Sequence, residues 1–281
     1  MRTNSVLALN QQGFHRMVYH EWGSADNDRV LVCVHGLARN SRDFDELALA
    51  LSRDYRVICP DVVGRGKSDW LPNGCGYELP QYLNDMTALL ARLNVDQVDW
   101  IGTSMGGIIG MCLAALPNSP IRSLVINDIG CFIPKESLQR IGQYLGDQRF
   151  ASLEEVEAYM RKTYTAYAGL SDQQWQHLAQ HGHRLEADGE LALHYDPSLA
   201  EATRQVQHED IDLWPIWQQI HCPQMLVWAE QSDVLTADTV ARMQQLNPSL
   251  ELHSIPGIGH APSLMETAQV NAVVQWLREH R

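Results

Sequence analysis

Five short runs of apolar, mostly β-branched residues recur along the chain, and longer stretches with apolar residues at helical spacing separate them. Each run is apolar on both alternating faces, which is typical of parallel strands that helices cover on each side. The alternation predicts an α/β fold with a mostly parallel central sheet flanked by helices. The five runs are Arg29–Gly36, Tyr55–Asp61, Val98–Ser104, Ile121–Gly130 and Gln224–Glu230, and residues 15–23 and 250–257 are expected to add strands at the sheet's margins.

One long segment breaks this alternation. From about Lys135 to Gln207 the sequence is polar and amphipathic at helical spacing, without a strand-like run. We expect a helical cap inserted over the carboxyl ends of the strands, where ligands bind in open α/β sheets. The alternative is a solvated helical decoration. The predicted organisation is a core of residues 1–133 and 209–281 with a cap of residues 134–208.

Charge and composition exclude several classes of partner. The 281 residues carry a formal net charge of −13, which disfavours nucleic acid and anionic membranes because both attract basic patches. The first residues lack the apolar length of a signal peptide, and no apolar run approaches the roughly 18 residues of a membrane span. Six cysteines show no C-x-x-C pair and mostly lie in apolar runs, so we expect core thiols in a reducing cytoplasm rather than disulfides or a metal site.

The sequence "GTSMG" carries the strongest chemical signal, because it fits G-x-S-x-G between a strand-like and a helix-like run. Gly102 and Gly106 would let neighbouring backbone pass close to a sharp turn that exposes the hydroxyl of Ser104. The amide of Met105 would begin the helix, where free N–H groups favour a developing oxyanion. This pattern predicts a nucleophilic serine.

A serine alcohol needs a base, and the base needs an orienting acid. Among twelve histidines, His260 stands in the glycine-rich loop "PGIGHAP" after a strand-like run, which favours it as the base. For the acid we favour Asp233, just past the fifth strand. Asp128, in "VINDIG", is the runner-up, and could instead accept backbone N–H bonds to anchor the crossover into the cap. The order Ser104, Asp233, His260 is that expected of a serine triad on this type of sheet.

The segment "VHGLARN" after the first strand should supply the second oxyanion donor. We expect the backbone N–H of Leu37 to face the amide of Met105. His35 is expected to hold this loop rather than to act as the base. The glycine-containing run Pro60–Asp69 does not fit a phosphate-binding motif and is predicted to pack beside the site, with Asp61 and Ser68 binding backbone amides.

Together, "HGLARNSRDF", "CPDVVGRGKSD", "GTSMGG", "WAEQSDVLT" and "PGIGHAP" resemble the α/β-hydrolase superfamily, in particular its capped bacterial carboxylesterase-like members. The resemblance covers nearly the whole chain and implies the α/β-hydrolase fold. Ser104 stands where haloalkane dehalogenases and epoxide hydrolases have aspartate. "HGL" departs from the His-Gly-Gly-Gly of the hormone-sensitive-lipase branch, and "GLARN" with Thr103 departs from the pattern of enzymes that cleave carbon–carbon bonds after aromatic ring opening.

These residues favour a serine hydrolase that cleaves a small-molecule carboxylic ester through an acyl-enzyme, with no metal and no cofactor. A second hypothesis keeps the triad but changes the bond, to carbon–carbon, thioester or lactone hydrolysis, or cofactor-free perhydrolysis. A third is a non-catalytic ligand receptor on a hydrolase scaffold. Fluorophosphonate labelling would separate a reactive serine from an inert one.

Overall fold

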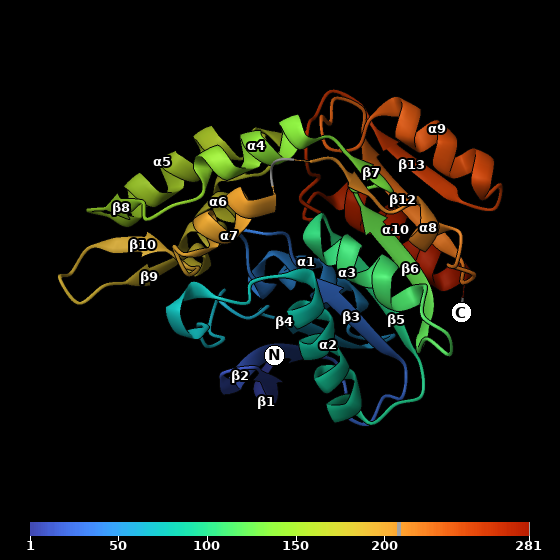
Figure 1. Ribbon diagram of the computed structural model, residues 1–281, viewed down its shortest axis with the longest axis horizontal. Helices are drawn as coiled ribbons and strands as arrows, with labels where there is room; N and C mark the ends of the chain where they lie inside the picture. The colour runs from blue at the N-terminus through green and yellow to red at the C-terminus, as the bar shows by residue number, and fades with distance from the viewer. Residues whose placement is uncertain (207–208, 281) are drawn as a thin grey trace.

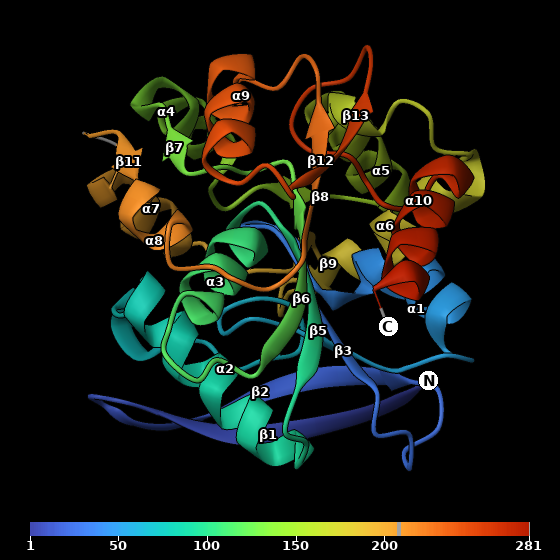
Figure 2. The ribbon, with the colours of Figure 1, turned by 90° about the vertical axis from the view of Figure 1, so that its right-hand side faces the viewer.

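A twisted eight-stranded sheet forms the centre of the molecule in the computed structural model, which describes residues 1–206 and 209–280 (Figures 1 and 2). Its strand order is β1-β2-β4-β3-β5-β6-β12-β13, and every pair from β4 to β13 is parallel. The mostly parallel sheet predicted from the sequence is therefore confirmed. The strands are β1 (Arg2–Asn10), β2 (Gly13–Trp22), β3 (Val30–Val34), β4 (Arg56–Pro60), β5 (Val98–Thr103), β6 (Ile121–Asn127), β12 (Gln224–Ala229) and β13 (Glu251–Ile255).

The antiparallel margin is larger than predicted. β2 was expected, but β1 was not, and the two form a long ribbon that joins the parallel strands through β2 and β4. β1 is the edge strand, and most of its residues are exposed or half-buried. A strand with so little burial does not show the apolar pattern that identifies the central strands.

Helices cover both faces of the sheet. One face packs on α1 (Asp45–Leu51) and α10 (Thr267–Glu279). The other packs on α2 (Leu79–Leu93), α3 (Met105–Ala114), α8 (Trp214–Trp217) and α9 (Ala237–Leu246). None of these helices, nor any other in the described residues, is long and apolar enough to cross a membrane.

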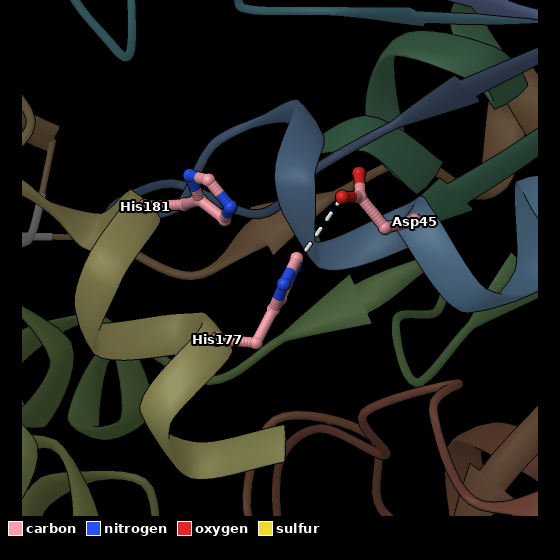
Figure 3. Close-up of side chains that lie close together, drawn as sticks. All are labelled: Asp45, His177 and His181. Carbon is pink, nitrogen blue, oxygen red and sulfur yellow. Dashed lines mark ion pairs between the residues drawn. The ribbon is translucent and has the colours of Figure 1, made fainter. Parts of the chain in front are cut away.

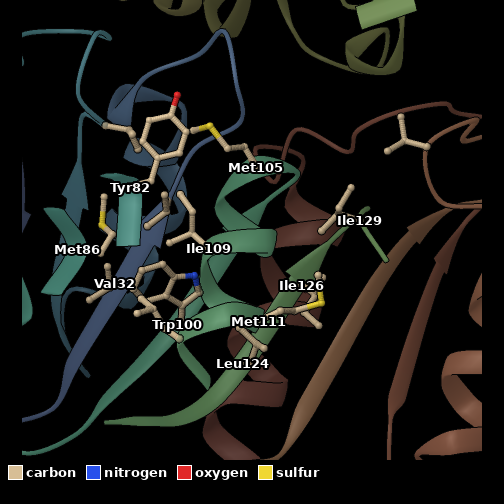
Figure 4. Close-up of a cluster of buried hydrophobic side chains, with 14 of the residues drawn as sticks. Val32, Tyr82, Met86, Trp100, Met105, Ile109, Met111, Leu124, Ile126 and Ile129 are labelled. Atoms are coloured by element: carbon tan, nitrogen blue, oxygen red, sulfur yellow. The ribbon is translucent and has the colours of Figure 1, made fainter. Parts of the chain in front are cut away.

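The tryptophan of β5 fixes α3 tightly against the sheet. Trp100 is fully buried (Figure 4), and its Nε1 donates a 3.1 Å hydrogen bond to the Gly106 carbonyl. A Cβ added at Gly110 would lie only 2.5 Å from that nitrogen, so glycine is required for this approach. The first turn of α3 is thereby held directly beyond the end of β5.

The inserted segment contains helices, as predicted, and also short strands that were not. Its helices are α4 (Lys135–Tyr144), α5 (Leu153–Thr163), α6 (Asp172–Gly182) and α7 (Leu199–Val206); its strands are β7 (Phe132–Ile133), β8 (Arg149–Phe150), β9 (His183–Leu185), β10 (Leu191–Leu193) and β11 (Ile211–Asp212). Strands of two or three residues are too short to show a period of two. Figure 1 shows this cap lying to one side of the core, beyond the carboxyl ends of the strands.

Apolar and polar contacts both join the cap to the core. The buried cluster that contains Trp100 continues into cap residues such as Met160 and Trp175. At the base of the insertion, β7 pairs with β11, close to the predicted boundary at residue 133. The predicted return boundary at 208 and 209, like the terminal residue 281, falls at positions outside or bordering the described residues, so the domain limits remain predictions.

Candidate active site

Ser104 occupies a sharp turn between β5 and α3, with φ 51° and ψ −115°. Positive φ is unfavourable for a residue with a Cβ, and surrounding packing must hold it. A Cβ at Gly102 would lie 2.2 Å from the Gly106 carbonyl oxygen, and one at Gly106 would lie 2.1 Å from that of Val34. Both positions therefore admit only glycine in this backbone, which explains the spacing of the motif.

The imidazole of His260 lies between the hydroxyl of Ser104 and a carboxylate. Its Nε2 is 2.9 Å from Ser104 Oγ, and its Nδ1 is 2.9 Å from Asp128 Oδ2. Because a carboxylate only accepts, Nδ1 carries the proton and Nε2 is left to accept from the serine hydroxyl. The arrangement can therefore remove a proton from Ser104 and stabilise the resulting imidazolium.

The preference for Asp233 over Asp128 as the acid was wrong. Asp128 is fully buried, adopts φ 54°, and its Oδ1 accepts a 2.8 Å hydrogen bond from the Ala229 N–H while Oδ2 faces His260. Asp233 is 46% exposed and forms a two-bond ion pair with Arg140 of α4, at 2.5 and 2.8 Å. Both aspartates follow adjacent parallel strands, but Asp128 is buried directly after β6, whereas Asp233 is exposed on the loop farther past β12.

Asn127 also helps to build this site, although nothing in the sequence pointed to it. Its Nδ2 donates to Thr103 Oγ1 at 3.0 Å and to the Pro262 carbonyl at 2.9 Å. It therefore ties the loop that carries His260 to the residue before Ser104. A lone asparagine at a strand end carries no distinguishing sequence signal.

Two backbone N–H groups border the same space as Ser104. Met105 is the first residue of α3, so its amide is one of the unpaired donors of a helix N-terminus. Leu37 lies on the loop after β3 and lines the same cavity as Met105. In the part of the chain that the structure describes, neither N–H donates to a backbone acceptor in a turn, loop or cap. Both are available to a substrate oxygen.

His35 holds the Leu37 amide in place, the role expected of it. Its Nε2 accepts from the Val62 N–H at 3.0 Å, so Nδ1 is the donor to the Gly36 carbonyl at 2.7 Å. In a trans peptide the C=O and the following N–H point in opposite directions, so fixing the Gly36 carbonyl also fixes the Leu37 N–H. A Cβ at Gly36 would meet its neighbours at ordinary distances of 3.8 Å or more, so this loop does not depend on that glycine.

Burial lowers the pKa of His35 to about 4. Because an unfolded histidine titrates near 6.5, the unfolded chain binds more protons between these values, and the free energy of unfolding should fall as the pH drops from about 6.5 to about 4. We expect His35→Gln, which does not titrate, to flatten this fall in urea unfolding measured at pH 7, 6 and 5. His181, whose pKa is also lowered to about 4 by burial, should leave a residual slope. An NMR titration of His35 with a midpoint near 6.5 would contradict the expectation.

A mainly apolar cavity of about 560 Å³ lies over Ser104, between the core and the cap. Cap helices α4 and α7 contribute to its wall, together with the loop after β6 and the segment before α2. The only charged side chains among its described lining residues are Glu78 and Glu201. The aliphatic part of the wall includes Ile108, Ile129, Ile133, Leu138, Ile141 and Val234.

The cap aromatics do not line this cavity. The ring of Tyr167 packs at a tilt against those of Tyr164 and Trp175, with ring centroids 5.7 and 6.1 Å apart, and Tyr159 packs on Phe150 at 5.3 Å. They form the core of the cap.

A second group of titratable side chains lies where α6 of the cap meets α1 of the core. Asp45 of α1 and His177 and His181 of α6 come together there (Figure 3), with ligand atoms within 4.8 Å of one another. The guanidinium of Arg42 supplies the positive charge in this cluster. It pairs with Asp45, and its Nη1 lies 3.2 Å from His181 Nδ1. The group fixes α6 to the core through this arginine.

Comparison with known proteins agrees with this geometry. A family model described as the alpha/beta hydrolase fold matches residues 29–267. The chain is 45% identical to a 3-hydroxybutyrate-oligomer hydrolase of Cupriavidus necator, over 98% of this chain and 97% of the relative. It is 27% identical to a 2-(acetamidomethylene)succinate hydrolase of Mesorhizobium japonicum, over 82% and 81%. The solved structure of an alpha/beta hydrolase from Novosphingobium aromaticivorans superposes with a TM-score of 0.85 at 33% identity, covering 99% of both chains.

Proposed function

Because the chain belongs to the α/β-hydrolase family, we propose that it is a serine hydrolase of carboxylic esters and that oligomeric hydroxyalkanoate esters are its substrate class. The observation that carries the proposal is the hydrogen-bonded series Ser104, His260 and Asp128 at the floor of an apolar cavity. The cavity volume lies within the usual range for a small-molecule site, about 300–1,000 Å³. The substrate class is supported by the similarity to the Cupriavidus necator hydrolase over nearly the full length of both chains.

Acylation begins when His260 Nε2 takes the proton of Ser104 Oγ as the oxygen attacks the ester carbonyl carbon. The carbonyl oxygen becomes an oxyanion that accepts from the N–H groups of Leu37 and Met105. As this tetrahedral intermediate collapses, the carbon–oxygen bond to the alcohol breaks, and His260 gives its proton to the leaving oxygen. The product is an acyl group on Ser104 and a free hydroxyl end.

Deacylation repeats these steps with water. His260 takes a proton from a water molecule that attacks the acyl carbonyl, and then returns that proton to Ser104 as the carboxylic acid leaves. Asp128 accepts from His260 Nδ1–H throughout and favours the imidazolium form in both half-reactions.

A substrate panel tests the bond and the substrate class together. We expect 3-hydroxybutyrate dimers and trimers to exceed matched thioesters, lactones and ring-fission diketones in kcat/KM. A preference of several decades for one of those other classes would contradict ester hydrolysis as the main activity.

The methyl esters of the same oligomers form a further arm of the panel. A carboxylate in the cavity would meet Glu78 and Glu201, of which Glu201 pairs with Arg204 at 2.8 Å, and no cation among the described lining residues. Masking it as a methyl ester should therefore raise kcat/KM by about tenfold, equivalent to about 1.4 kcal/mol. The gain should be smaller for a trimer that is cleaved at the ester bond nearer its hydroxyl end, because the charge then lies one unit farther from the scissile bond than in the dimer. An unchanged or lower kcat/KM for the methyl esters would place the carboxylate in contact with a cation instead.

A further inference from the structure

Arg65 is a fully buried cation that lies directly behind the candidate active site. It stands between two glycines of the loop after β4, and Gly64 and Gly66 both have positive φ. The same loop pairs with the cap, because the Gly66 N–H donates to the His194 carbonyl at 2.8 Å and the Asp196 N–H donates to the Gly64 carbonyl at 2.8 Å. Arg65 is therefore held at the junction of core, cap and site.

The guanidinium of Arg65 contacts both residues whose amides border Ser104. Its Nε donates to the Leu37 carbonyl at 2.9 Å, and its Nη2 lies 3.6 Å from Met105 Sδ. Its Nη1 donates to the Val63 carbonyl at 2.7 Å and to Tyr82 Oη at 3.0 Å. Four contacts from one planar group fix its position.

Leu37 is thereby held from both sides. His35 binds the carbonyl of the peptide unit before Leu37, and Arg65 binds that of the unit after it. Two fixed peptide planes determine the backbone angles of the residue between them. His35 therefore sets the direction of the Leu37 N–H, and Arg65 keeps the backbone that follows Leu37 in place.

The charge of Arg65 has no carboxylate partner within ion-pair distance in residues 1–206 and 209–280. The rings of Tyr82 and Tyr77 also face it, at 5.0 and 5.7 Å from the guanidinium carbon. Two buried carboxylates lie near it without pairing with it: Asp61 of the same loop, which a Cβ at Gly66 would meet, and Asp196, which accepts from the Tyr77 hydroxyl at 2.6 Å. Burying a cation is costly, and the oxygen atoms that accept hydrogen bonds from Arg65 belong to uncharged groups.

We propose that Arg65 is a positioning residue for the oxyanion hole, which steadies the loop that carries Leu37, packs on the Met105 side chain and places a positive charge behind the two N–H donors. The inference rests on the proposed ester hydrolysis at Ser104. A fixed charge and fixed dipoles in a dry environment stabilise an oxyanion more than the neutral carbonyl from which it forms. Arg65 should accordingly affect kcat rather than substrate binding.

The test compares an ester with its thionoester, in which sulfur replaces the carbonyl oxygen. Sulfur is larger and a weaker acceptor, so an intact oxyanion hole favours the oxygen substrate. For Arg65→Met we expect kcat on the ester to fall about 10- to 100-fold, with KM within about threefold of the wild-type value, because the loss resembles a weakened oxyanion donor. The preference for the ester over the thionoester should shrink about tenfold.

Two further variants keep the test decisive. Arg65→Lys retains the charge but cannot make the planar set of contacts, so it should show an intermediate loss of preference, and it replaces the methionine variant if that protein does not fold. Arg122→Met removes an ion pair with Asp99 at the other end of β5, and should lower the melting temperature without altering the preference. Equal losses on ester and thionoester in a folded Arg65 variant would overturn the inference. Failure of the proposed function would show differently, as a wild-type protein with no ester turnover.

Discussion

Replacing Ser104 with alanine is expected to lower kcat on p-nitrophenyl butyrate by about 10⁶-fold. The variant loses only the attacking oxygen. Alanine has a Cβ, as serine does, so the backbone at this position can keep its φ of 51° at no added cost. The free energy of unfolding should therefore change little, while the hydrogen bond to His260 disappears. Steady-state kinetics and a thermal melt on the same preparation measure the two effects separately.

Ser119→Ala is the matched control for this experiment. Ser119 lies before β6, at the end of the sheet opposite Ser104, and its hydroxyl oxygen accepts a hydrogen bond from the Ile121 N–H. Its variant should keep wild-type kcat and should react fully with a fluorophosphonate probe, whereas Ser104→Ala should not be labelled. If Ser104→Ala retained a large part of the activity, the acyl-enzyme mechanism would be wrong, and an unlabelled wild-type protein would favour a ligand receptor.

The sequence predicted the elements that have a strong local signal. The central strands are buried on both faces, so they show continuous apolar runs, and each predicted run contains the corresponding strand. The G-x-S-x-G motif placed Ser104 at a strand–helix turn because two close backbone approaches admit only glycine. The glycine-rich loop after β13 singled out His260 by its position. Each of these features depends on about ten consecutive residues, so a single sequence is enough to predict it.

The remaining features depend on contacts between distant segments. Arg65 and Asn127 act through bonds to residues 28 and 135 positions away. The short strands of the cap exist only because they pair with one another. No single-sequence pattern describes such pairings, since their partners are chosen by the packing of the cap on the core.

The choice between the two aspartates is the sharpest case of this kind. Asp128 and Asp233 follow β6 and β12, which are neighbours in the sheet with Asn127 paired to Val227. Either carboxylate could thus reach the carboxyl edge of the sheet, where His260 lies. No residue in the sequence rules out one of the two aspartates as the acid. Two contacts determine which carboxylate faces His260. Arg140 of α4 binds Asp233, and the Ala229 amide holds Asp128 toward the imidazole.

Asp128→Asn is expected to lower kcat by about 10⁴-fold, the loss that an asparagine causes at the acid of a serine triad. The asparagine can still accept from the Ala229 N–H through its oxygen, which turns its NH₂ group toward His260 Nδ1. That nitrogen must then act as an acceptor, and the ring proton moves to Nε2. An Nε2 that carries a proton cannot receive one from Ser104, so acylation fails although the geometry is kept.

Asp233→Asn supplies the comparison, because it makes the same chemical change at the other candidate acid. It removes an exposed ion pair with Arg140, and such pairs contribute about 0–1 kcal/mol, so kcat should stay within about twofold of the wild-type value. Measuring both variants against one ester at pH 7, with melting temperatures as the check on folding, separates the two roles. If Asp233→Asn lost more activity than Asp128→Asn, the carboxylate beside His260 would be a structural anchor and the acid would have to reach the ring by a movement of the α4 contact.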